Sequence, residues 1–242
     1  FKLEDNYPES LTVVNSITNS GFGNGTVAPS NASLTSGVAG KFGNAFRFNR
    51  GGGAVRPRIN TSYKLSATGD WTLAGWYKSN GATGTGYIAC SYHSAGDYVL
   101  FYGPDSENSD HKARLAVKGV PSIYSTVAPA IGQWHFYVAT RQDDTFSLYM
   151  DGVLQGSETV AGVSVQQTYA LNIGGLNSAS TPNTKAGDLD EVWVFDHALR
   201  VDEINLLYKN NAVGAYDPSP ADGDLVDPAL TTLSWTMSKA SN

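Results

Sequence analysis

Alternating apolar and polar residues, interrupted by glycine-bearing turns, form short runs along most of the chain. Aromatic and β-branched residues gather in the runs 41–48, 71–78, 86–92, 98–102, 113–117, 133–141, 145–150, 169–174 and 187–195. A period of two residues is that of a strand with one buried face. About a dozen short strands at this spacing favour a sandwich or jelly roll over a fold with helical crossovers. The sequence therefore predicts an all-β fold, either a sandwich or a jelly roll.

A segment near the end of this pattern shows helical periodicity instead. Ile204, Leu207 and Tyr208 are spaced three and four residues apart within 201–210, so they share one face of a helix. Acidic residues occupy its first turn and a lysine its last, which matches the direction of the helix dipole. Because so short a helix is marginal alone, we expect it to pack on the sandwich through its apolar face.

The two ends of the chain have a different character. Residues 1–7 have the pattern of an opening strand, whereas 8–40 are rich in Ser, Asn, Gly and Thr and predict a long loop with short edge strands. Near the other end, a proline-rich linker precedes a strand at 230–237 with a central tryptophan. We therefore divide the chain into a domain at 1–216 and a linker with the start of a second repeat at 217–242.

Composition and charge argue against a nucleic-acid-binding protein, a disulfide-stabilised fold and a membrane-spanning helix. Only 16% of the residues are charged and the formal net charge is -6, whereas nucleic-acid binding requires clustered Lys and Arg. Cys90 is the one cysteine, so no internal disulfide can form and burial must hold the fold. No apolar run approaches the length of about 18 residues that a spanning helix needs. The chain starts at Phe1 with no signal peptide, so we expect it to be part of a longer protein.

Three stretches carry a resemblance to a known family. They are Gly-Gln-Trp-His at 132–135 with Leu-Tyr-Met-Asp-Gly at 148–152, Leu-Asn-Ile-Gly-Gly at 171–175, and Gly-Asp-Leu-Asp-Glu-Val at 187–192 followed by Ala-Leu at 198–199. In this order they make residues 1–214 similar to the bacterial laminin-G-like, concanavalin-A-like jelly-roll family. The resemblance implies a two-sheet antiparallel jelly-roll sandwich with one short C-terminal helix. One departure is Arg200, where the family often has Ser or Thr to cap the helix.

The end of the chain carries a second resemblance. Residues 218–235, with Pro-Ser-Pro-Ala-Asp-Gly and then Leu-Ser-Trp, resemble the start of a fibronectin-III-like or related immunoglobulin-like repeat. Such repeats are common in multidomain extracellular bacterial proteins. The resemblance therefore implies a secreted or cell-surface protein with further domains.

The first family resemblance also implies a structural calcium ion. In such domains an acidic residue of the opening strand meets the Asp of the Asp-Glu-Val strand, which here are Asp5 or Glu4 and Asp190. Calcium takes about six to eight oxygen ligands, so main-chain carbonyls and water would complete the site. Alternation along the strand puts Asp188 on the same face as Asp190. The alternative is that these carboxylates are solvated or make hydrogen bonds in turns.

Strand alternation further predicts an exposed, tyrosine-rich surface. Its residues would be Tyr98, Tyr102, Arg114, Tyr137 and Tyr149 on the outer face of one sheet, with Tyr92, His93 and Tyr124 in adjoining loops. Sugars stack their C–H faces on aromatic rings while polar neighbours bond to the hydroxyls, so this set has the chemistry of a carbohydrate site. Ordinary cross-strand tyrosine packing, or burial under a loop, is the alternative.

The sequence contains no recognisable catalytic motif. A jelly-roll glucanase of the laminarinase type carries carboxylates in a pattern like Glu-x-Asp-x-x-Glu, and Asp188-Leu189-Asp190-Glu191 lacks that spacing. The four histidines show no zinc-binding spacing, and neither a Gly-x-Ser-x-Gly elbow nor a P-loop occurs.

These observations predict a non-catalytic, lectin-like module of an extracellular protein. Its partners would be an extracellular polysaccharide or glycan and other domains of the same chain, and its cofactor a structural calcium ion. One alternative is a structural or adhesive module for protein contact, which predicts calcium-dependent stability without sugar affinity. Another is a divergent glycoside hydrolase or lyase, which predicts polysaccharide turnover dependent on Asp188 or Asp190.

Overall fold

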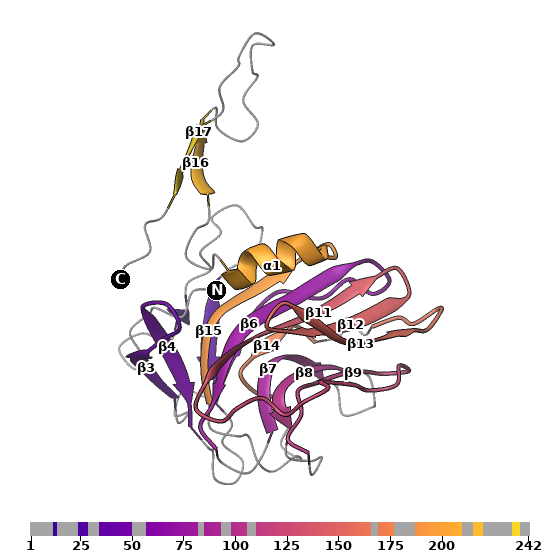
Figure 1. The fold of residues 1–242 in the computed structure, drawn as a ribbon, viewed down its shortest axis with the longest axis horizontal. Coiled ribbons are helices and arrows are strands. Elements are labelled where there is room, and N and C mark those ends of the chain that lie inside the picture. The colour runs from indigo at the N-terminus through magenta and orange to yellow at the C-terminus, as the bar shows by residue number, and fades with distance from the viewer. Residues whose placement is uncertain are drawn as a thin grey trace.

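The structure, a computed structural model, contains two antiparallel sheets stacked face to face (Figure 1). It describes residues 12–13, 24–28, 34–49, 57–81, 85–92, 98–105, 110–165, 169–176, 187–209, 215–219 and 234–237. The opening strand expected at 1–7 lies outside these residues. The described helix is not long and apolar enough to cross a membrane.

The strand order of each sheet is that of a sandwich. The eight-stranded sheet runs β1 (Thr12–Val13), β2 (Gly25–Ala28), β5 (Arg58–Asn60), β14 (Asn172–Ile173), β7 (Thr85–Tyr92), β8 (Tyr98–Asp105), β9 (Arg114–Val117) and β10 (Ile123–Tyr124). The seven-stranded sheet runs β13 (Val153–Thr159), β12 (Thr145–Met150), β11 (Trp134–Gln142), β6 (Trp71–Ser79), β15 (Gly187–Phe195), β4 (Asn44–Phe48) and β3 (Leu34–Ala39). The predicted all-β, two-sheet antiparallel sandwich is confirmed.

The main core lies between the sheets and follows the alternation of each strand. Leu73 and Tyr77 of β6 pack in one cluster with Ile88 of β7 and Phe101 of β8. All four are at most 2% exposed. Full burial of such an apolar side chain contributes about 1.5–3 kcal/mol, so this layer provides most of the stabilisation in a chain without disulfides.

The ring of Tyr77 fills space that three glycines leave open. A Cβ atom at Gly86 or Gly103 would lie 2.5 or 2.7 Å from an atom of the Tyr77 side chain, and one at Gly187 would overlap the Tyr77 hydroxyl. Close approach, rather than a turn conformation, therefore requires glycine at these positions of β7, β8 and β15. Burial, followed by the charge of Asp188, raises the pKa of the Tyr77 hydroxyl, so this side chain stays neutral.

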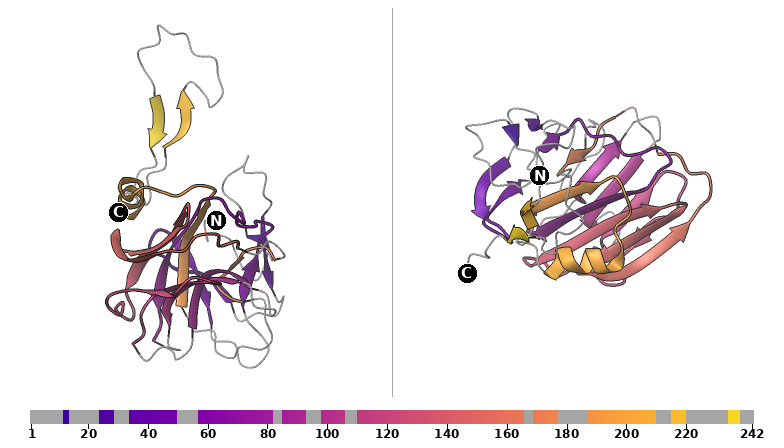
Figure 2. Two further views of the ribbon diagram at one scale, coloured as in Figure 1. Left: turned by 90° about the vertical axis from the view of Figure 1, so that its right-hand side faces the viewer. Right: turned by 90° about the horizontal axis from the view of Figure 1, so that it is seen from above.

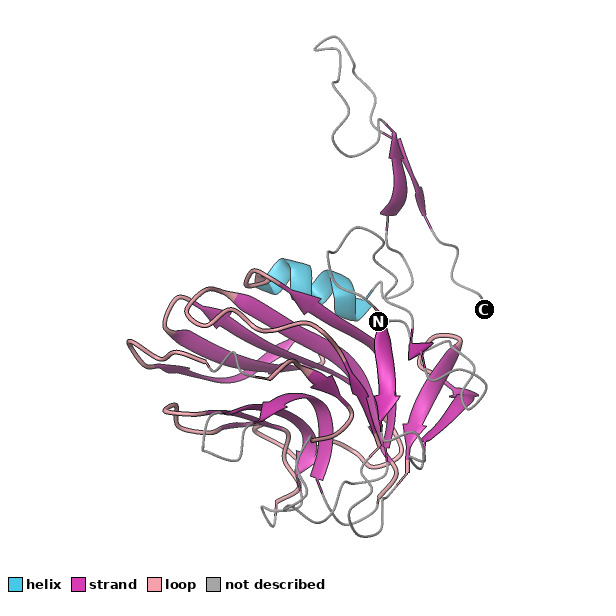
Figure 3. Ribbon diagram, turned by 180° about the vertical axis from the view of Figure 1, so that it is seen from behind, coloured by secondary structure: helices cyan, strands magenta, loops and turns pink. Residues whose placement is uncertain are grey.

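The helix α1 (Val201–Lys209) lies against the outer face of the seven-stranded sheet (Figures 1 and 3). Ile204 is fully buried there, and Tyr208 stacks on Trp76 at 5.8 Å and on Phe136 at 6.2 Å between ring centroids. Leu207 belongs to the same cluster. The predicted helix and its packing face are confirmed.

The start of α1 is capped without Ser or Thr. The main-chain N–H of Arg200 donates to Oε2 of Glu203 at 2.8 Å, which is one half of a capping box. The guanidinium of Arg200 also pairs with Asp202 in solvent. The helix therefore keeps an N-terminal hydrogen bond even though Arg200 replaces the Ser or Thr that often caps it in the family.

Tight turns join β11, β12 and β13 into consecutive hairpins. Asp151 and Gly152 have φ of 52° and 80°, and two successive positive values are typical of the type I′ turn that suits a hairpin. The hairpin of β11 and β12 is confirmed. The pattern did not predict β13, because its sequence Val-Leu-Gln-Gly-Ser-Glu-Thr lacks alternation and its side chains are mostly exposed.

Arg141 is a charged side chain buried within this part of the sandwich, at 2% exposed. Its Nε, Nη1 and Nη2 donate to the carbonyl oxygens of Asp143, Ala67 and Val163 at 2.9, 2.9 and 2.7 Å. The guanidinium also lies 5.2 Å from the ring centroid of Phe146. Arg141 therefore ties the turn after β11 to two loops that are distant in sequence.

A bulge in β15 changes the alternation of that strand. The register shifts between Asp190 and Trp193, and Glu191 has a φ of 47°. In an unbroken strand, residues three positions apart face opposite sides of the sheet. Because of the bulge, Leu189 and Val192 both face the main core. The carboxylates before the bulge remain on the outer face.

A separate two-stranded sheet follows α1. It consists of β16 (Ala215–Ser219) and β17 (Ser234–Met237), which pair antiparallel and are drawn in yellow in Figure 2. β16 includes Asp217 and Pro218, the first residues of the segment expected to be a linker. β17 contains Trp235 of the expected final strand, and the fibronectin-like repeat itself stays a prediction.

Candidate functional site

The outer face of the eight-stranded sheet carries a row of aromatic and cationic side chains, here called the tyrosine row. Tyr87 of β7 is opposite Tyr102 of β8, Tyr102 is opposite Arg114 of β9, and Arg114 is opposite Tyr124 of β10. Directly opposed residues share a face with Cβ atoms about 4.5–5.5 Å apart. The four side chains therefore form a line across neighbouring strands, three of which are labelled in Figure 1.

Arg114 occupies the centre of the tyrosine row. Its Cζ lies 5.5 Å from the ring centroids of both Tyr102 and Tyr124. Its Nε and Nη2 donate to Oγ of Ser122 at 3.2 and 3.0 Å. Cation–π contacts to two rings, with hydrogen bonds from the side, hold the guanidinium in one place. The row is therefore organised before any ligand arrives.

Exposure divides the tyrosine row into a supporting part and an accessible part. Tyr87 and Tyr102 are 6% and 3% exposed, and their ring centroids are 5.0 Å apart. Arg114 and Tyr124 are half-buried and reach the surface. The expectation that Tyr102 is open to a ligand is wrong, because its ring lies between Tyr87 and Arg114.

A second tyrosine pair lies on the same face, four residues along β8 from the row and so about 13 Å away. Tyr92 of β7 is opposite Tyr98 of β8. Both are half-buried and pack on the cluster that contains Leu100 and Tyr102. The structure thus brings Tyr92, Tyr98, Arg114 and Tyr124 to one face, with Tyr92 and Tyr124 on strands β7 and β10 rather than in the loops where the sequence placed them. His93 lies outside the described residues.

Tyr137 and Tyr149 do not belong to this face. They lie in the other sheet, where Tyr137 is opposite Met150 and Tyr149 is opposite Val138. Tyr137 is fully buried in the main core, where burial raises the pKa of its hydroxyl. Tyr149 packs in the cluster beneath α1. Placing these two with Tyr98 was wrong, because alternation predicts a face but not the sheet that a strand joins.

Asp190, the predicted calcium ligand on β15, is fully buried. Its Oδ2 accepts a hydrogen bond from the N–H of Phe42 at 2.9 Å. Asp5 and Glu4 lie outside the described residues. Within the described part of the chain, no group of three His, Cys, Asp or Glu side chains could hold a metal. A calcium site at Asp190 would need further oxygen ligands, either the predicted Asp5 or Glu4 or main-chain carbonyls. The calcium site therefore stays a prediction.

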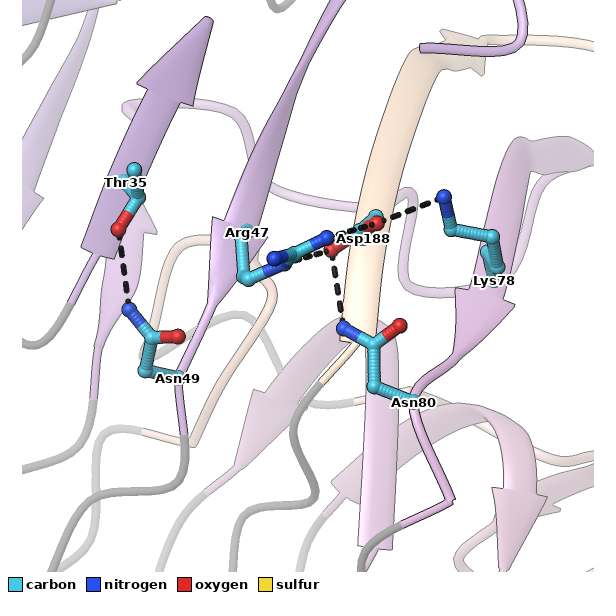
Figure 4. Close-up of polar contacts among 6 residues, drawn as sticks. All are labelled: Thr35, Arg47, Asn49, Lys78, Asn80 and Asp188. Carbon is cyan, nitrogen blue, oxygen red and sulfur yellow. Dashed lines mark hydrogen bonds and ion pairs between the residues drawn. The ribbon is translucent and has the colours of Figure 1, made fainter. Parts of the chain in front are cut away.

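Asp188, a second buried aspartate of β15, is surrounded by donors (Figure 4). Arg47 donates to it through Nε and Nη2 at 2.7 and 3.0 Å, and Asn80 donates at 3.1 Å. Nζ of Lys78 lies 2.9 Å from Oδ2. Burial raises the pKa of Asp188, but the bonds from Arg47, Lys78 and Asn80 outweigh burial and leave the pKa below its ordinary value. The carboxylate is therefore ionised and joins three strands.

Comparison with protein families agrees with this architecture. Residues 49–205, which are more than half of the chain, match the family Laminin_G_3, described as the concanavalin A-like lectin/glucanases superfamily. The chain belongs to this superfamily. The resemblance carried by the sequence motifs is thereby confirmed for residues 49–205. Among curated proteins, none matches the chain closely enough to count as a relative.

Solved structures share the fold of this concanavalin A-like domain at low identity. Domain 4 of AbnA, a GH43 extracellular arabinanase from Geobacillus stearothermophilus, in complex with arabinotriose, aligns with a TM-score of 0.63 and 16% identity, over 79% of this chain and 91% of that chain. The binding domain of Paraclostridial Mosquitocidal Protein 1 aligns with a TM-score of 0.59 and 12% identity, over 83% and 51% of the two chains.

The botulinum neurotoxin serotype D binding domain gives a similar result. Its TM-score is 0.54 at 14% identity, over 84% of this chain and 50% of that chain. The concanavalin A-like domain thus spans about half the length of either toxin binding domain. At these identities the likeness shows the fold alone.

Tyr87 is the member of the tyrosine row that the sequence pattern missed. Strict alternation back from Tyr92 and Cys90 would place it in the core of this concanavalin A-like domain. Register shifts between Thr85 and Ala89 instead turn Tyr87 outward, toward Tyr102. Gly86 was the available signal, since a glycine inside a strand pattern is typical of a bulge.

Proposed function

We propose that this concanavalin A-like domain is a non-catalytic carbohydrate-binding module of an extracellular protein. The ligand would be a glycan bound at Tyr92, Tyr98, Arg114 and Tyr124. The observation that carries the proposal is the half-buried guanidinium of Arg114, which lies 5.5 Å from the ring centroids of the buried Tyr102 and the half-buried Tyr124. Half-buried rings suit the C–H faces of a sugar, and an adjacent fixed cation suits its hydroxyl oxygens.

Relatives in fold give independent support. The arabinanase domain is in complex with arabinotriose, and the two toxin domains are binding domains. The fully buried Asp188, which four donor contacts engage, is also a poor candidate for a nucleophile or an acid. These points favour binding over hydrolysis as the function of this chain.

Replacing Tyr124 by alanine is expected to weaken glycan binding about tenfold, because one stacked ring contributes about 1–1.5 kcal/mol. The measurement is retardation in native gels that contain neutral polysaccharides, with arabinan among them. Tyr98→Ala should act similarly. Tyr124→Phe is the matched control and should keep its retardation, since it preserves the ring. Wild-type protein that binds no glycan in a broad panel would contradict the proposal.

The proposal includes a structural calcium ion at Asp190. Calcium at 100-fold its Kd would stabilise the folded state by about 2.7 kcal/mol, so we expect the Tm to rise with calcium and fall with a chelator. Asp190→Asn should abolish this response, while its amide oxygen can still accept from Phe42. Magnesium is the control ion. A Tm that is equal with calcium and with chelator would rule the ion out.

A further inference from the structure

A second row of polar side chains crosses the outer face of the seven-stranded sheet. Arg47 of β4 is opposite Asp188 of β15, Asp188 is opposite Lys78 of β6, and Lys78 is opposite Trp134 of β11. We call these four residues the cationic row. With strands about 4.8 Å apart, the row is about 14 Å long. It faces away from the tyrosine row, because the two outer faces of a sandwich point in opposite directions.

The cationic row holds more positive charge than its own carboxylate requires. Arg47 and Lys78 both contact Asp188, which is fully buried. One cation would neutralise this carboxylate, so the pair leaves a surplus of one positive charge. The whole chain carries a formal charge of -6. A positive surplus fixed at one place on an acidic protein is a local attraction for an anion.

Both cations keep donors for a further acceptor. Arg47 directs Nε and Nη2 to Asp188, which leaves Nη1, and Lys78 has three N–H groups of which one faces Asp188. The side chains of Arg47 and Lys78 are 40% and 19% exposed. Figure 4 shows them reaching Asp188 from opposite sides. The buried carboxylate thus positions two cations that are both partly exposed and keep N–H groups not engaged by Asp188.

Trp134 adds an apolar surface beside these charges. Nζ of Lys78 lies 4.9 Å from its ring centroid, and the indole is half-buried. Asn80 is exposed next to the row, and its Nδ2 faces Asp188. An inorganic anion would use only the cations. A sugar ring with an acidic substituent would use the indole, the amide and the cations together.

We propose that the cationic row binds an acidic glycan, with its carboxylate or sulfate between Arg47 and Lys78 and a sugar ring on Trp134. The site is separate from the tyrosine row and does not depend on the function proposed there.

The test is calorimetric titration with two acidic probes, oligogalacturonate for carboxylate and dextran sulfate oligomers for sulfate. Neutral arabinan oligomers serve as the comparison. We expect binding of one or both acidic probes, weaker at about 300 mM than at about 50 mM NaCl. Arg47→Met and Lys78→Met should each weaken it at least about tenfold. Either variant leaves one cation for Asp188, so both should fold. Trp134→Ala should also weaken binding, and Trp134→Phe should restore part of it.

Two controls separate this proposal from its rivals. Arg200→Met removes an exposed cation elsewhere and should leave the affinity unchanged. Tyr124→Ala should leave acidic-glycan binding intact. If Tyr124→Ala were the one variant that lost binding of the acidic probes, the acidic ligand would lie on the tyrosine row. That result would overturn this proposal but not the function proposed for the tyrosine row. Wild-type protein that binds neither acidic probe, or folded row variants that bind as tightly as wild type, would show that the cationic row merely joins strands.

Discussion

Replacing Arg141 by methionine is expected to lower the free energy of unfolding by about 3–5 kcal/mol. Three carbonyl oxygens, those of Asp143, Ala67 and Val163, would lose their charged donor inside the sandwich. Each such bond contributes about 1.5–3 kcal/mol, and the cost of burying the guanidinium offsets part of the sum. Methionine fills the volume of the aliphatic stem without supplying a donor. Urea unfolding followed by tryptophan fluorescence measures the change.

Two further variants test whether the lost stability comes from the three hydrogen bonds of Arg141. Arg141→Lys keeps the charge but cannot reach three carbonyls in different directions, so it should recover only part of the stability. Arg200→Met alters an arginine whose side chain is 71% exposed, and its unfolding midpoint should match the wild type. An Arg141→Met midpoint equal to that of the wild type would refute the role assigned to Arg141.

The second large effect concerns Asp188. Asp188→Asn is expected to cost about 2–4 kcal/mol near neutral pH, because it leaves Arg47 and Lys78 close together without their counterion. The estimate is moderated by the partial exposure of both cations, which lets solvent screen them. The amide also presents an N–H group where the carboxylate accepted bonds. Thermal and urea unfolding of the variant give the difference directly.

The difference in stability between wild type and Asp188→Asn should depend on pH, in a direction set by the pKa of Asp188. The pKa of Asp188 in the folded state lies below its ordinary value, so the stabilisation is complete above about pH 4 and is lost as the pH falls through the folded pKa. The gap between wild type and Asp188→Asn should therefore stay constant from about pH 7 to about pH 5 and narrow below about pH 4. A gap equally wide at about pH 2 would show that Asp188 is not the titrating group.

The strands and the helix could be predicted because their signals are local. Aromatic and β-branched alternation marked β6, β11 and β15, and three apolar residues marked α1. β13 was missed because an edge strand with exposed side chains needs no apolar face. Its pairing with β12 comes from the turn at Asp151-Gly152 rather than from its own composition.

The candidate sites were predicted in part for a related reason. Alternation correctly grouped Tyr98 with Tyr102, but it could not tell that Tyr137 belongs to the other sheet. The cationic row escaped the sequence altogether. Arg47 and Asp188 are 141 positions apart, and only the antiparallel register of β4 with β15 brings them together. Long-range register is set by packing, which no local pattern encodes.

The stacking of two sheets gives the molecule two outward surfaces with unlike chemistry, the tyrosine row on one and the cationic row beside the packing face of α1 on the other. Sheets packed about 10 Å apart, with side chains on both outer faces, are too thick for one short oligosaccharide to reach around. A domain that engages ligands on both surfaces would bridge two separate polymer chains. Mixed with a neutral and an acidic polysaccharide, it would act as a cross-link and raise the viscosity of the blend above that of either polymer alone.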